Sequence, residues 1–179
     1  LGRRGAELVL VDIDPQGVEE SAEVLRQEGV QAMTIAADCS KVDDIRRAVA
    51  TATRSCERID ILVNNAGIGF VEGQLTPEEM TLDEWQLVNR INMDGVMLGC
   101  KLAIEAMKET GGAIVNIASV GGLFASPLAV PYGAGKAAVI QFTKTVAYYC
   151  AKRGYPIRCN AVLPGTIRTS LYLSLIHIS

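Results

Sequence analysis

A serine, a tyrosine and a lysine lie in the sequence in an arrangement that could transfer a proton. Ser119 follows the apolar run 113–118, which predicts a buried strand. Tyr132 and Lys136 begin the next segment, and on a helix this i, i+4 spacing places their Cβ atoms about 5–6 Å apart on one face. A phenol is a poor base near neutral pH, but a nearby ammonium stabilises the phenolate, and a serine hydroxyl can hydrogen-bond the reacting oxygen. General acid–base catalysis is one interpretation; since Y-x-x-x-K is common, an ordinary helix face is the other.

The elements that must position these residues follow from the hydrophobic pattern. Short apolar runs alternate with segments that carry apolar residues at helical spacing. The predicted strands are 7–11, 30–36, 60–63, 113–118 and 157–162, and the predicted helices are 15–28, 42–55, one that begins after Thr81, 93–109 and 132–153. Ser40 and Thr81 are predicted N-caps. Strands that alternate with helices predict an α/β fold, a doubly wound parallel sheet with helices on both faces.

Polar or turn-forming residues follow each predicted strand, and ligands of open parallel sheets bind beyond these carboxyl ends. The residues are Asp12, Asp38, Asn64-Asn65, Ser119 and Pro164-Gly165. A carboxylate at Asp12 could accept hydrogen bonds from an adenosine ribose and would repel a 2′-phosphate. Ile13 rather than a basic residue follows, which favours NAD over NADP. Alternatively, Asp12 or Asp14 only caps the next helix. The basic pair Arg3-Arg4 is the one feature that would favour NADP instead of NAD.

Two asparagine positions allow a functional and a local interpretation. The small residues of Asn64-Asn65-Ala66-Gly67 would let the backbone approach a flat ligand, and an asparagine amide could brace a neighbouring strand. The same tetrapeptide could be an ordinary turn. Asn92, in R-I-N-M-D-G, could interrupt a helix and free a backbone carbonyl for water, or it could be a local cap.

Composition narrows the class of protein. The 179 residues suffice for one domain, and 49% hydrophobic with 21% charged residues is typical of a soluble globular chain. A net charge of −3 argues against nucleic-acid and membrane partners, and neither a membrane-length apolar run nor a signal peptide is present. Five scattered cysteines and one histidine predict reduced thiols in a cytoplasmic protein, with no metal or disulfide role.

Together the motifs resemble the short-chain dehydrogenase/reductase family, from Leu1 to Thr169. They are Asn64-Asn65-Ala66-Gly67, Asn92, Ser119, Tyr132-x-x-x-Lys136 and Pro164-Gly165-x-Ile167-x-Thr169, with 27 residues from Asn92 to Ser119 and 13 from Ser119 to Tyr132. The sequence of 99–120 and 149–160 is similar to bacterial 3β/17β-hydroxysteroid and secondary-alcohol dehydrogenases. The resemblance implies a Rossmann-type fold and an NAD-dependent oxidoreductase that acts on a secondary alcohol or ketone, with a steroid or cyclic alcohol among the candidates.

The resemblance also implies a role for each matching residue. Tyr132 would be the general acid/base, Lys136 would stabilise its phenolate and hold the nicotinamide ribose, and Ser119 would orient the substrate oxygen. Asn92 would position a water that relays protons from Lys136. The implied cofactor contacts are Asp12 with the adenosine ribose, Asp38 and Cys39 with the adenine, Asn65, Ala66 and Gly67 along the cofactor, Pro164 and Gly165 at the turn, and Ile167 and Thr169 with the nicotinamide amide.

The sequence also departs from the family pattern at both ends. The glycine-rich turn that holds the pyrophosphate is absent, as is its central strand, which would lie between strands 7–11 and 60–63. The last strand is also absent, and 171–179 is unlike the family. We therefore expect an incomplete dinucleotide-binding catalytic domain over residues 1–170 and a non-native tail over 171–179.

Several alternatives stay open on these grounds. The chain as given could be a non-catalytic fragment that binds no NAD alone. A dinucleotide-sensing regulator would not need Tyr132 and Lys136 at this spacing, and a sugar-nucleotide epimerase fits the Ser119 region less well. The apolar helices 93–109 and 132–153 could pack between subunits, which predicts a homo-oligomer, a tetramer or dimer, in the full-length form.

Overall fold

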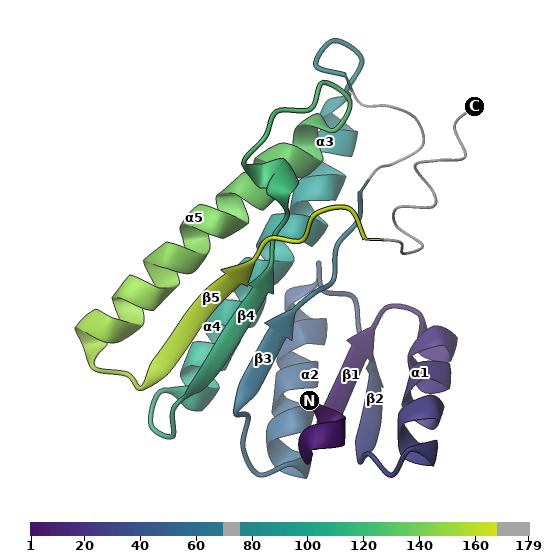
Figure 1. The fold of residues 1–179 in the computed structure, drawn as a ribbon, viewed down its shortest axis with the longest axis vertical. Helices are drawn as coiled ribbons and strands as arrows, with labels where there is room; N and C mark the ends of the chain where they lie inside the picture. The colour runs from purple at the N-terminus through teal and green to yellow at the C-terminus, as the bar shows by residue number, and fades with distance from the viewer. Residues whose placement is uncertain (70–75, 168–179) are drawn as a thin grey trace. The chain divides into compact units, whose positions relative to one another are not determined.

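The computed structural model describes residues 1–69 and 76–167, which form two compact units that meet in sequence between Ile59 and Asp60 (Figure 1). Every strand and helix expected from the sequence is present, and all strand pairs are parallel, which confirms the α/β prediction. Within the described ranges, no helix is both long and apolar enough to cross a bilayer.

The first unit is a two-stranded sheet with a helix after each strand. Its elements are a 3₁₀ turn Gly2–Arg4, β1 Leu8–Asp12, α1 Pro15–Gln27, β2 Ala32–Ala36 and α2 Val42–Ser55. Leu8 pairs with Ala32 and Asp12 pairs with Ala36, so both strands end level. Ile35, Ala37 and Ala48 form a small core under this sheet. The level ends bring the loops after β1 and β2 to the same edge.

The second unit is a three-stranded sheet in the order β3-β4-β5. Its elements are β3 Ile61–Asn64, α3 Leu82–Asn89, a π-helical turn Arg90–Asp94, α4 Gly95–Met107, β4 Gly112–Ile117, a 3₁₀ turn Val120–Gly122, α5 Val130–Arg153 and β5 Ile157–Val162. Figure 1 shows β4 between its two neighbours, with the long helix α5 running beside β5. Asn64 pairs with Asn116, which in turn pairs with Ala161, so the ends of all three strands are aligned.

The two predicted helix caps have different outcomes. Thr81 is confirmed as the N-cap of α3, because its hydroxyl accepts the Glu84 N–H while the Glu84 carboxylate accepts the Thr81 N–H. Ser40 was predicted to cap α2, and this is wrong. Lys41 occupies that position, and the Ser40 hydroxyl donates instead to the Asp38 carboxylate at 2.7 Å. The N-cap of the helix lies one residue later than predicted, so Ser40 lies just before it.

The predicted helix boundary at Asn92 is also different in the structure. α3 and α4 are joined without a break by the π-helical turn, so Asn92 lies inside a continuous helical segment. Its side chain is bound elsewhere and does not cap a helix. Single π-helical turns of this kind occur frequently at functional sites.

Candidate active site

Lys136 is a buried lysine that joins α5 to the end of β4. Its side chain is 4% exposed, and its Nζ donates a hydrogen bond to the backbone oxygen of Ile117 at 2.8 Å. Ile117 is the last residue of β4, two positions before Ser119. Burial lowers the pKa of Lys136, because a charged ammonium is less stable away from water. This bond therefore fixes the depth of α5 beside the strand that leads to Ser119.

Tyr132 lies one helical turn before Lys136 on the same face of α5, as the spacing predicts. The Lys136 Nζ is 5.6 Å from the centre of the Tyr132 ring, a distance typical of a cation–π contact. Tyr132 itself is half-buried, so its ring is neither enclosed in the core nor fully in water. The ammonium is close enough to stabilise negative charge on the phenol.

Ser119 approaches the same tyrosine across Gly121. The Ser119 Oγ accepts the Gly121 N–H at 3.0 Å. A Cβ added to Gly121 would lie 3.4 Å from the Ser119 Oγ and 3.5 Å from the Tyr132 Cε1. Ser119 and the Tyr132 ring therefore border the same small space, which the missing side chain of Gly121 leaves open. The structure thus brings Ser119, Tyr132 and Lys136 together at the carboxyl end of β4.

Asn92 holds the loop after β3 next to Lys136. Its side chain is fully buried, its Oδ1 accepts the Ile68 N–H, and its Nδ2 donates to the Ile68 oxygen, both at 2.8 Å. A Cβ on Gly67 would lie 3.0 Å from the Asn92 Oδ1 and 3.4 Å from the Lys136 Nζ. A glycine is therefore required for this close approach, and the amide of Asn92 anchors the loop. The implied water relay at Asn92 stays a prediction.

A buried polar network lies beneath the site. In it the Asn64 amide braces the neighbouring strand β4, as one of the two interpretations predicted, but the central residue Asn116 was not expected from the sequence. The Asn116 Oδ1 accepts from the Asn64 Nδ2 at 2.8 Å, and the Asn116 Nδ2 donates to the Thr143 Oγ1 at 2.9 Å. The Thr143 hydroxyl in turn donates to the Val139 oxygen at 2.7 Å. Asn116 thus ties β4 to both β3 and α5. The signal that could have found it is a single amide inside the apolar run 113–118, because a buried amide needs partners.

Two buried thiols extend this network. The Cys100 thiol donates to the Asn116 Oδ1 at 3.5 Å, and the Cys159 Sγ accepts from the Asn116 Nδ2 at 3.7 Å. A hydrogen bond with Cys100, together with burial, raises the pKa of Cys159 far above its usual range. Cys159 is therefore a neutral thiol, and all five cysteines of the chain are free.

In the first unit, Asp12 lies exposed at the end of β1. Its Oδ1 accepts the Asp14 N–H at 3.0 Å, and Asp14 is the N-cap of α1 through the Gln16 N–H. Helix capping therefore falls to Asp14 and not to Asp12. Arg3, which would have favoured NADP, forms a bidentate ion pair with Glu28, with both N–O distances at 2.7 Å.

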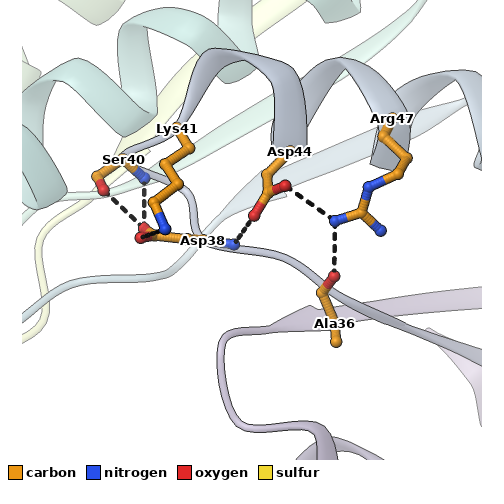
Figure 2. A network of polar contacts seen from close by, with 6 residues as sticks. All are labelled: Ala36, Asp38, Ser40, Lys41, Asp44 and Arg47. Carbon is orange, nitrogen blue, oxygen red and sulfur yellow. Dashed lines mark hydrogen bonds and ion pairs between the residues drawn. The ribbon is translucent and has the colours of Figure 1, made fainter.

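Asp38 lies at the end of β2 inside a polar network (Figure 2). Its carboxylate accepts the Ser40 hydroxyl and N–H, and the Lys41 Nζ is 3.5 Å away. The Asp38 N–H donates to Asp44, which also binds Arg47. Hydrogen bonds from Ser40 lower the pKa of Asp38, so this carboxylate stays ionised at neutral pH.

The other predicted cofactor residues lie at strand ends. Burial raises the pKa of the half-buried Cys39 thiol. Asn65, Ala66 and Gly67 are exposed after β3, and Gly165 and Ile167 are exposed after β5. The Pro164 oxygen accepts the Val120 N–H at 3.1 Å, which links the end of β5 to the turn after Ser119. Thr169 and the tail 171–179 lie outside the described residues.

Comparison with known proteins gives consistent matches. The family model for short chain dehydrogenases matches residues 1–176. The chain is 37% identical over 158 residues to glucose 1-dehydrogenase 2 of Bacillus subtilis, covering 87% of this chain and 60% of that protein. It is 34% identical over 169 residues to 3beta-hydroxysteroid dehydrogenase 2 of Eggerthella lenta, covering 93% and 64%. The crystal structure of levodione reductase matches with a TM-score of 0.91 at 34% identity, over 97% of this chain and 67% of that one.

These matches confirm the resemblance that the sequence motifs predicted, including the Rossmann-type fold. The chain is shorter than these relatives, because it spans about three fifths of the length of the curated proteins it matches. The comparisons leave the role of each individual site residue as a prediction.

Proposed function

Because the chain belongs to the short-chain dehydrogenase family, we propose that it carries the catalytic residues of an NAD-dependent oxidoreductase acting on a secondary alcohol or ketone. Oxidoreduction is the activity that the family and its relatives support. The observation that carries the finer proposal is the convergence of Ser119, Tyr132 and Lys136 at the end of β4. A steroid or another cyclic alcohol is within the range of substrates that we consider.

In this mechanism Tyr132 exchanges the proton of the substrate oxygen. During oxidation its phenolate accepts the hydroxyl proton of the alcohol, and during reduction its phenol returns a proton to the carbonyl oxygen. The Ser119 hydroxyl donates a hydrogen bond to the same oxygen and holds it near the phenol. The Lys136 ammonium, 5.6 Å from the centre of the ring, stabilises the phenolate. A bound nicotinamide supplies the hydride chemistry.

Each unit carries groups that could hold one part of a dinucleotide, and NAD is the dinucleotide that we propose for the full-length protein. Lys136 uses one of its three N–H donors on Ile117, so its ammonium can also bind ribose hydroxyls. Gly67 lets the backbone lie directly beside this ammonium, where a side chain would intrude. In the first unit, the exposed carboxylate of Asp12 would accept from an adenosine ribose and repel a 2′-phosphate, and Asp38 could accept from an adenine amino group.

The proposal is tested with the Tyr132→Phe variant of the protein at its full natural length. We expect alcohol-dependent NADH formation to fall by at least about 10²-fold, because the proton-transfer group is lost. Tyr148→Phe is the matched control, since Tyr148 lies on the same helix and is 65% exposed. Near-full activity of Tyr132→Phe would mean that the tyrosine mechanism is wrong.

The coenzyme preference has its own test. In Asp12→Ala the repulsion of a 2′-phosphate is removed, so we expect the ratio of kcat/KM for NAD over NADP to fall by about tenfold. Asp14→Ala is the control, because it removes the neighbouring carboxylate that caps α1. An unchanged ratio in Asp12→Ala would reject the proposed ribose contact.

A second proposal concerns the chain as printed. Because it spans about three fifths of its relatives, we propose that these 179 residues alone bind no dinucleotide. Isothermal titration calorimetry of the chain with NAD tests this, and micromolar binding would refute it. This outcome is independent of the activity of the full-length protein.

We also propose that the full-length protein is a homo-oligomer, a dimer or tetramer. Met97 on α4 and Tyr149 on α5 are 37% and 47% exposed, so both apolar helices leave surface that a second subunit could cover. Light scattering that finds a monomer would remove this proposal.

A further inference from the structure

The turn that follows Ser119 presents large apolar side chains to solvent. Leu123 and Phe124 are 61% and 70% exposed, and Val120 and Leu128 are 36% and 37% exposed. Single exposed apolar residues are common, but several large ones in one short segment indicate a surface that binds something. We call these four residues the apolar turn.

The first part of the apolar turn is held in a fixed conformation. The Leu123 and Phe124 N–H groups donate to the Val120 oxygen at 2.9 and 3.1 Å, and the Val120 N–H donates to Pro164. A Cβ on Gly122 would lie 2.8 Å from backbone atoms of Lys136 and Ala137, so the turn is pressed against α5. Leu123 and Phe124 are therefore exposed on an ordered support, which lowers the entropic cost of binding an apolar partner.

The same turn borders the reacting groups. Gly121, which lies between Val120 and Leu123 in the sequence, borders both the Ser119 hydroxyl and the Tyr132 ring. Ser119 and Tyr132 are the two ends of the segment that contains the turn. A substrate whose oxygen reaches both hydroxyls would therefore have its adjoining carbon atoms beside the apolar turn.

The segment offers no charge to a substrate. Between Glu109 and Lys144 the only charged side chain is Lys136, which is buried and bound to Ile117. A carboxylate, phosphate or sulfonate next to the reacting carbon would find no cation in this segment. A polyol would lose hydrogen bonds to water against these apolar side chains. The exposed side chains of the apolar turn offer no hydrogen bonds in exchange, so this loss is unfavourable.

From these observations we infer the substrate class. The substrate is an uncharged alcohol or ketone whose carbon skeleton next to the reacting oxygen is apolar and large enough to contact both Leu123 and Phe124. This inference rests on the proposed function, since it places the reacting oxygen at Ser119 and Tyr132. The apolar turn then selects substrates by removing their hydrocarbon surface from water.

Activity measurements on the full-length protein test the inference with NAD and three alcohols. They are 2-decalol as an apolar bicyclic alcohol, glucose as a polyol and 3-hydroxybutyrate as an anionic alcohol. We expect kcat/KM for 2-decalol to exceed the other two by at least about 100-fold, because one misplaced polar or charged group costs that much. A higher kcat/KM with glucose or 3-hydroxybutyrate would overturn the inference and leave the oxidoreductase proposal standing.

Variants of the turn provide the second arm. In Phe124→Ser we expect kcat/KM for 2-decalol to fall by about tenfold or more, because an apolar contact of this size is lost. Leu82→Ser is the matched control, since Leu82 is equally exposed at 67% but lies at the start of α3. Equal effects of the two substitutions on kcat/KM would overturn the inference.

Equilibrium dialysis with 2-decalone gives a readout that needs no turnover. If the protein neither oxidises nor reduces any of these compounds, the proposed function fails. Weaker binding of 2-decalone by Phe124→Ser than by Leu82→Ser would still support an apolar binding site. The turn could instead be covered by another part of the protein or by a second copy. In that case Phe124→Ser lowers the Tm or the measured mass while 2-decalone binding is unchanged, and the inference is overturned.

Discussion

The strongest prediction concerns Asn116, the amide that joins three elements beneath the candidate site. We expect Asn116→Ala to destabilise the second unit much more than Asn160→Ala. Asn160 is the matched control because it is an asparagine on the neighbouring strand β5 whose side chain is exposed. Both substitutions remove the same atoms, so the difference between them measures the buried contacts.

The magnitude follows from the partners of Asn116. The substitution removes its hydrogen bonds to Asn64 and Thr143 at 2.8 and 2.9 Å, each worth about 1 kcal/mol net. Thr143 still donates to Val139, but the Asn64 amide retains only a weak contact with the Cys100 sulfur at 3.5 Å. Leaving that buried donor poorly satisfied adds about 1–2 kcal/mol. We therefore expect a loss of about 3–4 kcal/mol in the free energy of unfolding.

Urea unfolding followed by tryptophan fluorescence measures this loss, because Trp85 on α3 is the only tryptophan and lies in the second unit. A double-mutant cycle of Asn116→Ala with Thr143→Val isolates one bond, and we expect a coupling energy of about 1 kcal/mol. If Asn116→Ala costs no more than Asn160→Ala, or if the two substitutions in the cycle are additive, the network does not join these elements.

Three further predictions test smaller parts of the structure. Thr81→Ala should cost about 1 kcal/mol in unfolding free energy, because α3 loses its capping hydroxyl; Thr81→Ser should restore most of it. Gly99→Ala should cost about 1–3 kcal/mol, because the new Cβ would collide with the Asn64 amide and displace it from Asn116; an unchanged urea midpoint would contradict this. Asp38→Asn should destabilise the first unit by about 1 kcal/mol at neutral pH, because hydrogen bonds to the ionised carboxylate are lost. These bonds lower the pKa of Asp38, so the stability they give is present above the ordinary carboxyl pKa and is lost as the pH falls through the lowered value. Its effect, measured by circular dichroism during urea unfolding, should therefore shrink in acid, and an effect independent of pH would reject the ionised contact.

Local features of this fold were predictable because they depend on neighbouring residues. The apolar periodicity located every strand and helix, and the i, i+4 spacing placed Tyr132 and Lys136 on one face. Thr81 was recognisable as a cap because Glu84 follows it by three residues and completes a capping box. The prediction for Ser40 was wrong because α2 has Lys41 as its N-cap, one residue later. Sequence alone does not locate the cap of a helix to within one position.

Features that depend on distant residues were harder to predict. Asn116 meets Asn64 and Thr143, which are 52 and 27 residues away, so no local pattern identifies its partners. Asn92 was expected either to free a backbone carbonyl or to cap a helix, whereas its side chain binds Ile68, 24 residues away. The proximity of Ser119 to Tyr132 was implied by the family spacing and not by any local rule. These contacts form only when the strands and helices assemble.

The partner of Lys136 explains how a buried lysine can serve the site. Burying an ammonium is unfavourable, and a carboxylate would be its usual compensation. Among residues 1–69 and 76–167, no carboxylate pairs with Lys136, and burial is the cause of its lowered pKa. Its partner is the neutral Ile117 carbonyl, which satisfies one donor without cancelling the charge. A carboxylate there would neutralise the field at Tyr132, so a carbonyl is the partner that keeps the positive charge available to a phenolate.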